Sequence, residues 1–279
     1  MEKMESTYNL EKEKGINVTI HAIFARHGEK VNDPNSSETG LSPEGETGTL
    51  AFGRTREKED MIKSYSSDTP RTKDSGKNIV KSSPTEKKGD QRKKQELAFI
   101  CDLNGDFYKE AMRIKAGVMI SKENFESLTE EERVEKTRIY EDRQANYYIS
   151  FGERRPDPET YSPVETAAKI AQLVEHYIKM SAKLNSGSSV DLINDTHDFN
   201  MISFLSQVLV LEKDGKKKTG FSSVEEIGGA TKYAEAFEII IHRNEIGEKS
   251  MKLLFRGKEW EMDMEHLEEL VKLSKDITL

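Results

Sequence analysis

The segment INVTIHAIFARHGE, residues 16–29, decides the fold prediction. Residues 16–25 form an apolar, β-branched run. Such a run, when it stops at Arg, His and Gly, is typical of a buried strand whose carboxyl end carries charged groups. In open α/β sheets, ligands bind at the carboxyl ends of the strands. A histidine beside an arginine at that edge suits attack on a phosphoryl group, with the imidazole of His27 as nucleophile and the guanidinium of Arg26 holding phosphate oxygens.

Composition limits the classes of partner. The 279 residues contain 43 Lys and Arg against 51 Asp and Glu, a formal net charge of −8, so we expect neither nucleic acid nor an anionic membrane as a partner. The single cysteine, Cys101, excludes an intrachain disulfide and a cysteine-based zinc site, and we expect it to be a small buried hydrophobe. The sequence does not indicate an oligomeric state.

The amino-terminal residues 1–14 are polar and charged, and we expect them to be flexible. They resemble neither a signal peptide nor a membrane anchor. No run reaches the ~18–20 apolar residues of a spanning helix. The expectation is a soluble, cytoplasmic protein.

Strand and helix signals alternate after the first strand. Ser42, Pro43 and Glu44 are an N-cap, a first helical residue and a first-turn anion, and they predict a helix that runs to about residue 57. A strand at 61–67 and a helix at 70–80 follow, and the polar stretch 82–94 is interpreted as a surface loop.

Residues 100–160 differ from the rest because they are dense in Glu, Lys and Arg, with helical spacing over 123–144. We interpret them as a helical cap inserted over the active-site edge of the sheet. Ser162, with Glu165 three residues later, predicts a capping box at the start of another helix. The remaining predicted elements are a strand at 190–194, a helix at 199–210, a strand pair at 238–242 and 251–255, and a helix at 264–275.

Alternating strands and helices imply a parallel sheet with helices on both faces. The fold class is therefore predicted as α/β, a three-layer α/β/α arrangement in a single domain. The sheet is expected to be mainly parallel, with one late antiparallel strand or hairpin.

Two more strand ends carry polar groups. The predicted strand 61–67 leads into a helix whose first turn bears Arg71, and a helix amino terminus with a guanidinium is an anion site. The strand 190–194 leads to His197 and Asp198. We therefore expect Arg26, His27, Arg71, His197 and Asp198 to converge on one edge.

This combination resembles the histidine phosphatase superfamily, which has the phosphoglycerate mutase-like fold. Members carry an RHG signature after the first strand, here at 26–28, and a YSSxxxRxxxTA-like segment, here at 65–76 with Ser75-Gly76 in place of TA. A late second histidine is represented by Thr196-His197-Asp198.

The resemblance implies a metal-independent phosphatase that hydrolyses a small phosphorylated substrate through phosphorylated His27, without a cofactor. Arg26, Arg71 and His197 would bind phosphate and stabilise charge on the transferred group. The general acid would be Asp198, as in the acid-phosphatase branch, or Glu96, as in the mutase branch. A phosphomutase and a non-catalytic phosphate-binding protein are the alternatives.

Several departures and simpler interpretations stay open. Lys30 and Asn32 stand where the acid-phosphatase branch has Arg and Pro, and Asn32 is counted among the expected substrate-binding residues. Asp198 can also be a helix cap, and Glu96 a surface glutamate. A metal site at Asp195, His197 and Asp198 is a minor alternative, and the sequence does not name the substrate.

Overall fold

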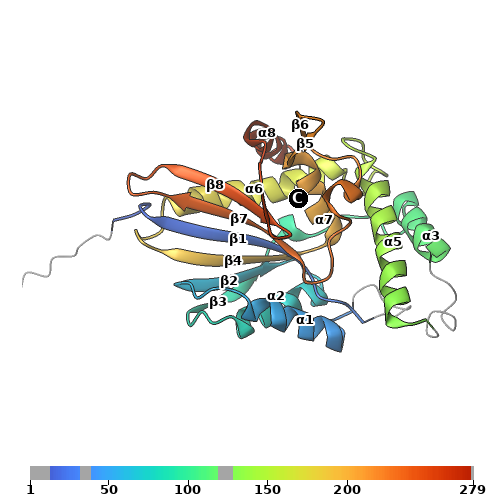
Figure 1. Ribbon diagram of the computed structural model, residues 1–279, viewed down its shortest axis with the longest axis horizontal. Coiled ribbons are helices and arrows are strands. Elements are labelled where there is room, and N and C mark those ends of the chain that lie inside the picture. Colours follow the sequence, from blue (N-terminus) through green and yellow to red (C-terminus); the bar gives the residue numbers. More distant parts are fainter. Residues whose placement is uncertain (1–12, 32–38, 119–127, 278–279) are drawn as a thin grey trace, which may run out of the picture.

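Strand β1 (Val18–Arg26) lies inside a seven-stranded sheet in the computed structural model, which describes residues 13–31, 39–118 and 128–277. The strand order is β3-β2-β4-β1-β7-β8-β9 (Figure 1). The other strands of this sheet are β2 (Met61–Ser66), β3 (Lys88–Lys93), β4 (Ser189–Thr196), β7 (Ala236–Arg243), β8 (Lys249–Phe255) and β9 (Lys258–Trp260).

The first four strands of this order are parallel to one another. β7 is antiparallel to β1, β8 to β7 and β9 to β8, so β8 runs in the same direction as the parallel group. Five of the seven strands therefore share one direction, and the late hairpin expected from the sequence is the β7–β8 pair.

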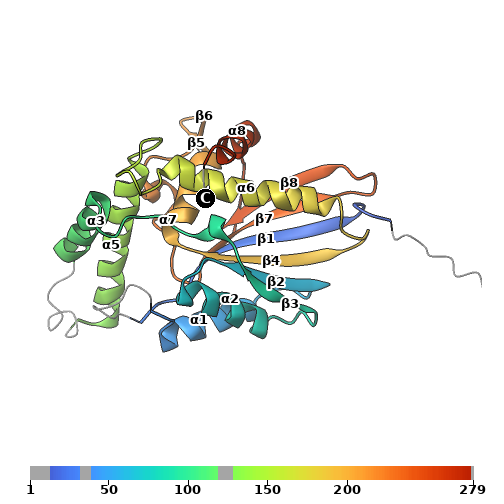
Figure 2. The same ribbon diagram turned by 180° about the vertical axis from the view of Figure 1, so that it is seen from behind.

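Helices cover both faces, which confirms the predicted three layers. Along β1, Ala22 and Phe24 face a core shared with α6 (Pro163–Ser181) and α7 (Asp198–Val208), whereas Ile23 and Ala25 face the other side. That second side is covered by α1 (Pro43–Arg54) and α2 (Pro70–Ser82), and α8 (Met264–Ser274) packs on α6. Figures 1 and 2 show these two helical layers from opposite sides. Burial of both faces explains why the segment is a continuous apolar run.

Two helices of the 100–160 region stand at one end of the sheet, where β1 and β4 finish (Figure 1). α3 (Asp106–Val118) packs against α5 (Glu130–Ile149), and α5 also contacts α7 and the short 3₁₀ helix η2 (Val224–Ile227). A second 3₁₀ turn, η1 (Gln95–Leu97), precedes them. We refer to α3 and α5 with the segment 99–103 as the cap.

The predicted helix starts agree with the observed caps. Ser42 Oγ accepts a hydrogen bond from Gly45 N over 3.0 Å. Ser162 and Glu165 form the reciprocal capping box, with Ser162 Oγ accepting from Glu165 N and Ser162 N donating to Glu165. Both helices therefore begin where the sequence predicted.

Other boundaries were wrong. The stretch 82–94 contains β3, an exposed edge strand of sequence KGDQRK, so it lacks the apolar pattern by which strands are recognised. A two-stranded sheet, β5 (Val210–Lys213) with β6 (Lys216–Thr219), was also not predicted. The helix expected at 123–144 is α5, which ends at residue 149. Most of the segment 1–14 lies outside the described residues.

None of the helices in the described ranges is both long enough and apolar enough to cross a membrane.

Candidate active site

Backbone pairing at the carboxyl end of β1 places Arg26 and His27. Arg26 lies opposite Thr196 of the parallel strand β4, and His27 N donates to the Thr196 carbonyl over 3.1 Å. On the other side, Arg26 N donates to Glu235 O over 2.9 Å. Both side chains are nearly buried, with exposed fractions of 7% for Arg26 and 6% for His27. The central strand therefore delivers an arginine and a histidine to one edge of the sheet, as predicted.

The hydrogen bonds of His27 define which nitrogen carries the proton. Nδ1 lies 2.7 Å from the Gly28 carbonyl oxygen, which only accepts, so Nδ1 is the protonated nitrogen. Nε2 accepts from Arg71 Nε over 3.1 Å, so its lone pair is directed at the guanidinium. Burial and the nearby His197, Arg71 and Arg26 hold the pKa of His27 well below its ordinary value. His27 is thus a neutral imidazole whose Nε2 lone pair accepts a hydrogen bond from Arg71.

Gly28 allows the turn after His27 to touch α1. A Cβ at Gly28 would lie 2.6 Å from the carbonyl oxygen of Gly45, and one at Gly45 would lie 2.0 Å from the carbonyl oxygen of Glu29. The Gly28 amide donates to Ser75 Oγ over 2.9 Å, which connects the turn to α2. Glycine at position 28 and serine at 75 therefore fix the orientation of the His27 ring.

His197 and Arg71 come from two further strand ends. The His197 ring stands edge-on to the His27 ring, with 5.4 Å between centroids, and its Nε2 lies 3.1 Å from Ser67 Oγ. Burial, together with Arg71, Arg26 and Lys30, lowers the pKa of His197 to about 3. An unliganded site therefore holds two neutral imidazoles among cations, and a bound anion would stabilise the protonated form of either ring.

Arg26 is held by groups that the sequence did not single out. Its guanidinium donates to Glu141 Oε1 over 2.6 Å and to the Thr231 carbonyl, and it stacks 4.0 Å from the centre of the Tyr233 ring. Burial alone would lower the pKa of Arg26, but Glu141 and Asp198 raise it well above its ordinary value. Glu141 belongs to the cap and Tyr233 to a loop, and neither sits in a motif that links it to Arg26.

Asp198 is the first residue of α7, but it is not the helix cap. His197 occupies the N-cap position, and Oδ1 of Asp198 accepts from the backbone N–H of Thr231 over 3.1 Å and from its hydroxyl. Burial is the main cause that raises the pKa of Asp198 to about 6. The carboxyl group thus keeps its proton to a higher pH than an ordinary aspartate does, and the capping interpretation was wrong.

The structure does not bring Glu96, the alternative candidate for the general acid, to this site. Glu96 lies in η1 near Lys169 of α6 and does not line the cavity described below. The neighbouring residue fixes the position of Glu96 in the turn. Leu97 is fully buried, and its carbonyl accepts hydrogen bonds from Thr196 Oγ1 and Asn200 Nδ2. Asn32, the other expected substrate-binding residue, lies outside the described residues.

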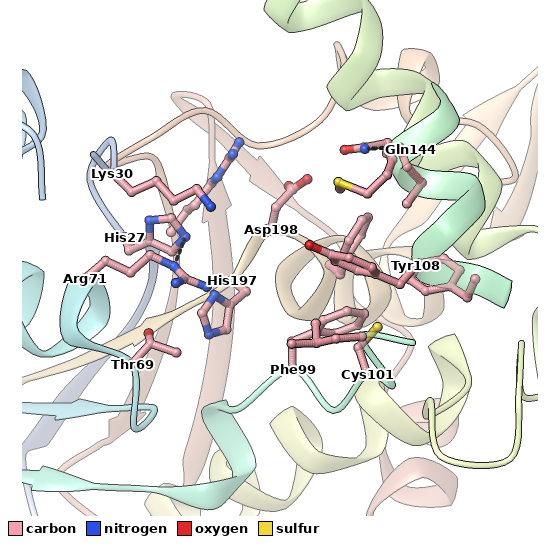
Figure 3. A pocket seen from close by; sticks show the side chains of 16 residues that line it. His27, Lys30, Thr69, Arg71, Phe99, Cys101, Tyr108, Gln144, His197 and Asp198 are labelled. Atoms are coloured by element: carbon pink, nitrogen blue, oxygen red, sulfur yellow. Dashed lines mark hydrogen bonds between the residues drawn. The ribbon is translucent and has the colours of Figure 1, made fainter. Parts of the chain in front are cut away.

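The converging residues open into a cavity of about 390 Å³ between the sheet edge and the cap (Figure 3). Lys30 points into it beside His27, and Cys101 lines it while remaining partly exposed, in contrast to the expected burial. Burial raises the pKa of the Cys101 thiol to about 11, so it is not a thiolate. The sixteen lining residues are Arg26, His27, Lys30, Thr69, Arg71, Phe99, Cys101, Leu103, Phe107, Tyr108, Ala111, Met112, Gln144, His197, Asp198 and Phe199.

The alternative metal site at Asp195, His197 and Asp198 does not form. Asp195 is fully buried and does not line the cavity. A Cβ at Gly76 of α2 would lie 2.6 Å from Asp195 Oδ2, which places this carboxyl under α2. The same contact explains why glycine stands where the superfamily motif has alanine.

A second charged cluster lies under the carboxyl end of α1, and we call its five residues the His21 cluster. Ligand atoms of His21, Glu59 and Asp191 lie within 4.8 Å of one another. Arg56 donates to both oxygens of Asp191 over 3.2 and 3.3 Å, and to Glu238 over 3.2 Å. His21 Nδ1 lies 2.5 Å from Glu238 Oε1. Because the guanidinium already occupies the carboxylates, the cluster is an internal ion-pair network.

No family profile and no curated protein matches the sequence. Solved structures do match the fold. Phosphoglycerate mutase from Bacillus anthracis str. Sterne is 13% identical with a TM-score of 0.49, over 92% of this chain and 98% of that one. These neighbours are histidine phosphatase superfamily proteins.

Two further neighbours of that superfamily are phosphatases. Mycobacterial glucosyl-3-phosphoglycerate phosphatase is 14% identical with a TM-score of 0.47, over 88% of this chain and 97% of that chain. Entamoeba histolytica phosphoserine phosphatase in complex with 3-phosphoglyceric acid is 14% identical with a TM-score of 0.42, over 89% and 99%. The likeness to these structures concerns the fold.

Proposed function

We propose that this chain is a phosphatase of the histidine phosphatase superfamily, which hydrolyses phosphomonoesters through a phosphohistidine on His27. The observation that carries the proposal is the state of His27. Its Nδ1 proton is engaged by the Gly28 carbonyl, and its Nε2 lone pair is presented beside the Arg71 guanidinium. A neutral imidazole with that orientation can attack phosphorus once a bound phosphate takes over the Arg71 N–H and leaves the Nε2 lone pair open.

The surrounding cations supply the electrostatic part. Arg71, Arg26 and Lys30 lie around the two histidines, and all three line the cavity. Their N–H groups would take the place of the water that hydrates a phosphate dianion. Their positive charge would stabilise the phosphoryl group as it moves between oxygen and nitrogen. The proposed mechanism needs no metal, because three cationic side chains perform the task that a divalent ion performs elsewhere.

Asp198 is the proposed general acid. Thr231 holds one carboxyl oxygen, and the raised pKa of about 6 keeps a useful fraction protonated near neutral pH. In the first step, Nε2 of His27 attacks phosphorus, the ester P–O bond breaks, and the leaving oxygen takes the Asp198 proton. In the second step, the Asp198 carboxylate takes a proton from water. The resulting hydroxide attacks phosphorus, the P–N bond breaks, and inorganic phosphate leaves.

The test is phosphate release from a panel of phosphomonoesters with EDTA present, in a cytoplasm-like reducing buffer that matches the proposed location. Wild type is compared with His27→Ala and with His176→Ala, which removes an exposed histidine of α6. We expect release by wild type and His176→Ala that survives the chelator, and none by His27→Ala.

Three outcomes would contradict this proposal. Loss of activity in EDTA would show a metal-dependent reaction. Isomer exchange without net phosphate release would show a phosphomutase. If the wild type released phosphate from no ester of the panel but still bound inorganic phosphate, it would be a non-catalytic phosphate-binding protein.

A further inference from the structure

The cavity has two chemically different walls. The described cations that line it, Arg26, Lys30 and Arg71, all lie on the sheet side around His27. The opposite wall is formed by aromatic and aliphatic side chains of the cap and the first turn of α7 (Figure 3). These are Phe99, Leu103, Phe107, Tyr108, Ala111, Met112 and Phe199. The phosphate half and the far half of the cavity are therefore suited to different parts of one ligand.

The aromatic wall is already assembled. The Phe99 and Phe199 rings lie 4.9 Å apart, and Phe107 lies 5.9 Å from Phe199 and 6.4 Å from Phe99. Rings that hold one another in place lose little further freedom when a ligand packs on them. The cavity thus offers a rigid apolar surface facing the proposed phosphate site.

The rim continues this apolar surface into solvent. Leu103 and Met112 line the cavity with exposed fractions of 51% and 39%, which is unusual for aliphatic side chains that serve only packing. A ligand with an apolar end would cover both.

Few of the described side chains on this wall are polar. Gln144 donates its amide to Ala111 O over 2.6 Å, and Tyr108 is the other polar group. Lys115 of α3 does not line the cavity, and its Nζ lies 5.4 Å from the centre of the Tyr140 ring. A substrate with a second anionic group on its alcohol part would have to place that charge against Phe99, Phe199 and Met112, where the described wall offers Gln144 and Tyr108 as polar groups, which is costly.

We propose that the substrates are phosphomonoesters of an apolar, ring-bearing alcohol, whose phosphate binds at His27 and whose ring packs on the Phe99–Phe199 wall. This inference rests on the proposed function, since it assigns the alcohol part of the same reaction. A volume of about 390 Å³ suits a phosphate with one or two rings.

The test compares three primary alkyl phosphates, so that the intrinsic reactivity of the leaving alcohol changes little. These are 2-phenylethyl phosphate, ethyl phosphate and O-phosphoserine. We expect kcat/KM for the phenylethyl ester to exceed that for the ethyl ester by about 30-fold, the usual gain from burying one ring. Phosphoserine should be the poorest substrate.

Two variants reverse the character of the rim. Leu103→Lys and Met112→Lys each place a cation in the apolar wall, and both sites are exposed enough to accept it. We expect the ratio of phenylethyl to phosphoserine kcat/KM to fall at least about 10-fold in each. Val134→Lys is the matched control, because Val134 is an exposed aliphatic residue of α5 that does not line the cavity.

The outcomes separate the two proposals. Wild type that turns over phosphoserine as well as the phenylethyl ester, or rim variants that behave like Val134→Lys, would overturn the substrate class while leaving the phosphatase intact. Failure of wild type on all three esters and on the wider panel would count against the proposed function itself.

Discussion

Two histidines of the same segment, six residues apart, occupy opposite electrostatic surroundings. His21, inside β1, contacts Glu238 at 2.5 Å and Glu59 at 3.6 Å. His27, just beyond the end of β1, is next to Arg71, Arg26 and His197. Burial alone would lower both pKa values. The carboxylates around His21 nevertheless raise its pKa, whereas the cations around His27 lower its pKa further.

The comparison distinguishes a structural charge cluster from a binding site. In the His21 cluster, Arg56 pairs with Asp191 and Glu238, and Glu59 contacts His21, so each carboxylate already has a basic partner. At the candidate active site, Arg26, Lys30 and Arg71 all line the cavity beside His27, an arrangement that suits the proposed phosphate. Residue types alone do not separate the two, since both contain histidine, arginine and carboxylates.

The largest expected effect is the loss of turnover when His27 is replaced. His27→Ala should lower kcat/KM for phosphate release by at least about 1,000-fold, because it removes the proposed nucleophile. Its unfolding free energy should stay near the wild-type value. His21→Gln should show the reverse, with turnover within a factor of about two. Equal loss of turnover in both variants would count against the distinction.

The next largest effect is the loss of stability when the His21 cluster loses Arg56. Arg56→Met leaves the buried Asp191 and the partly buried Glu238 without their guanidinium, and removal of one partner of a buried pair costs about 3–5 kcal/mol. Urea unfolding should show this loss, while kcat/KM of the folded protein stays close to wild type. A stability change below about 1 kcal/mol would show that the network is not structural.

A smaller effect, the pH dependence of kcat/KM, tests whether Asp198 is the general acid. With a pKa of about 6, its acid form is depleted as the pH rises, so kcat/KM for an alkyl phosphate should fall about tenfold per pH unit above pH 6. Asp198→Asn should lower kcat/KM by about 10–100-fold at pH 6 and remove this dependence. The same substrate is used throughout, so the ionisation of its phosphate cancels in the comparison. A variant that keeps the wild-type pH profile would exclude Asp198 as the acid.

The smallest effect concerns His21 and the pH dependence of stability. The hydrogen bond to Glu238 raises its folded-state pKa, so its stabilising contribution is complete below the unfolded pKa of about 6.5 and is lost as the pH rises through the raised value. The difference in unfolding free energy between wild type and His21→Gln should therefore be larger at pH 5.5 than at pH 9. A difference that grows with pH would refute the assignment of charge.

The sequence predicted the elements whose side chains meet the core. β1, β2, β4 and the β7–β8 hairpin carry apolar patterns, so each was found. β3 and β6 were not found, because their charged or polar side chains face solvent and form no apolar pattern. β5 was not found either, since only two of its four residues, Val210 and Leu211, are apolar. Backbone pairing leaves no mark on local composition.

The residues of the candidate site also fall into a predictable and an unpredictable group. Arg26, His27, Arg71, His197 and Asp198 were predictable, because each follows a strand or opens a helix inside a short motif. Glu141 and Thr231 were not, since they reach Arg26 and Asp198 from a cap helix and a loop more than 30 residues away in the chain. Glu96 was misplaced because the side-chain direction in a 3₁₀ turn depends on how Leu97 is buried.

The central claim is that His27 Nε2 carries the phosphoryl group, and the most direct measurement traps it there. Wild type is mixed with a ³²P-labelled phosphomonoester, quenched in alkali during turnover, and digested for peptide mapping. We predict a label that is stable in alkali, labile in acid, and located on the peptide containing His27. An Asp198→Asn sample should hold more label, because attack of water is slowed. Phosphate release by wild type without any label on that peptide, under conditions where a phosphohistidine standard survives, would contradict the account.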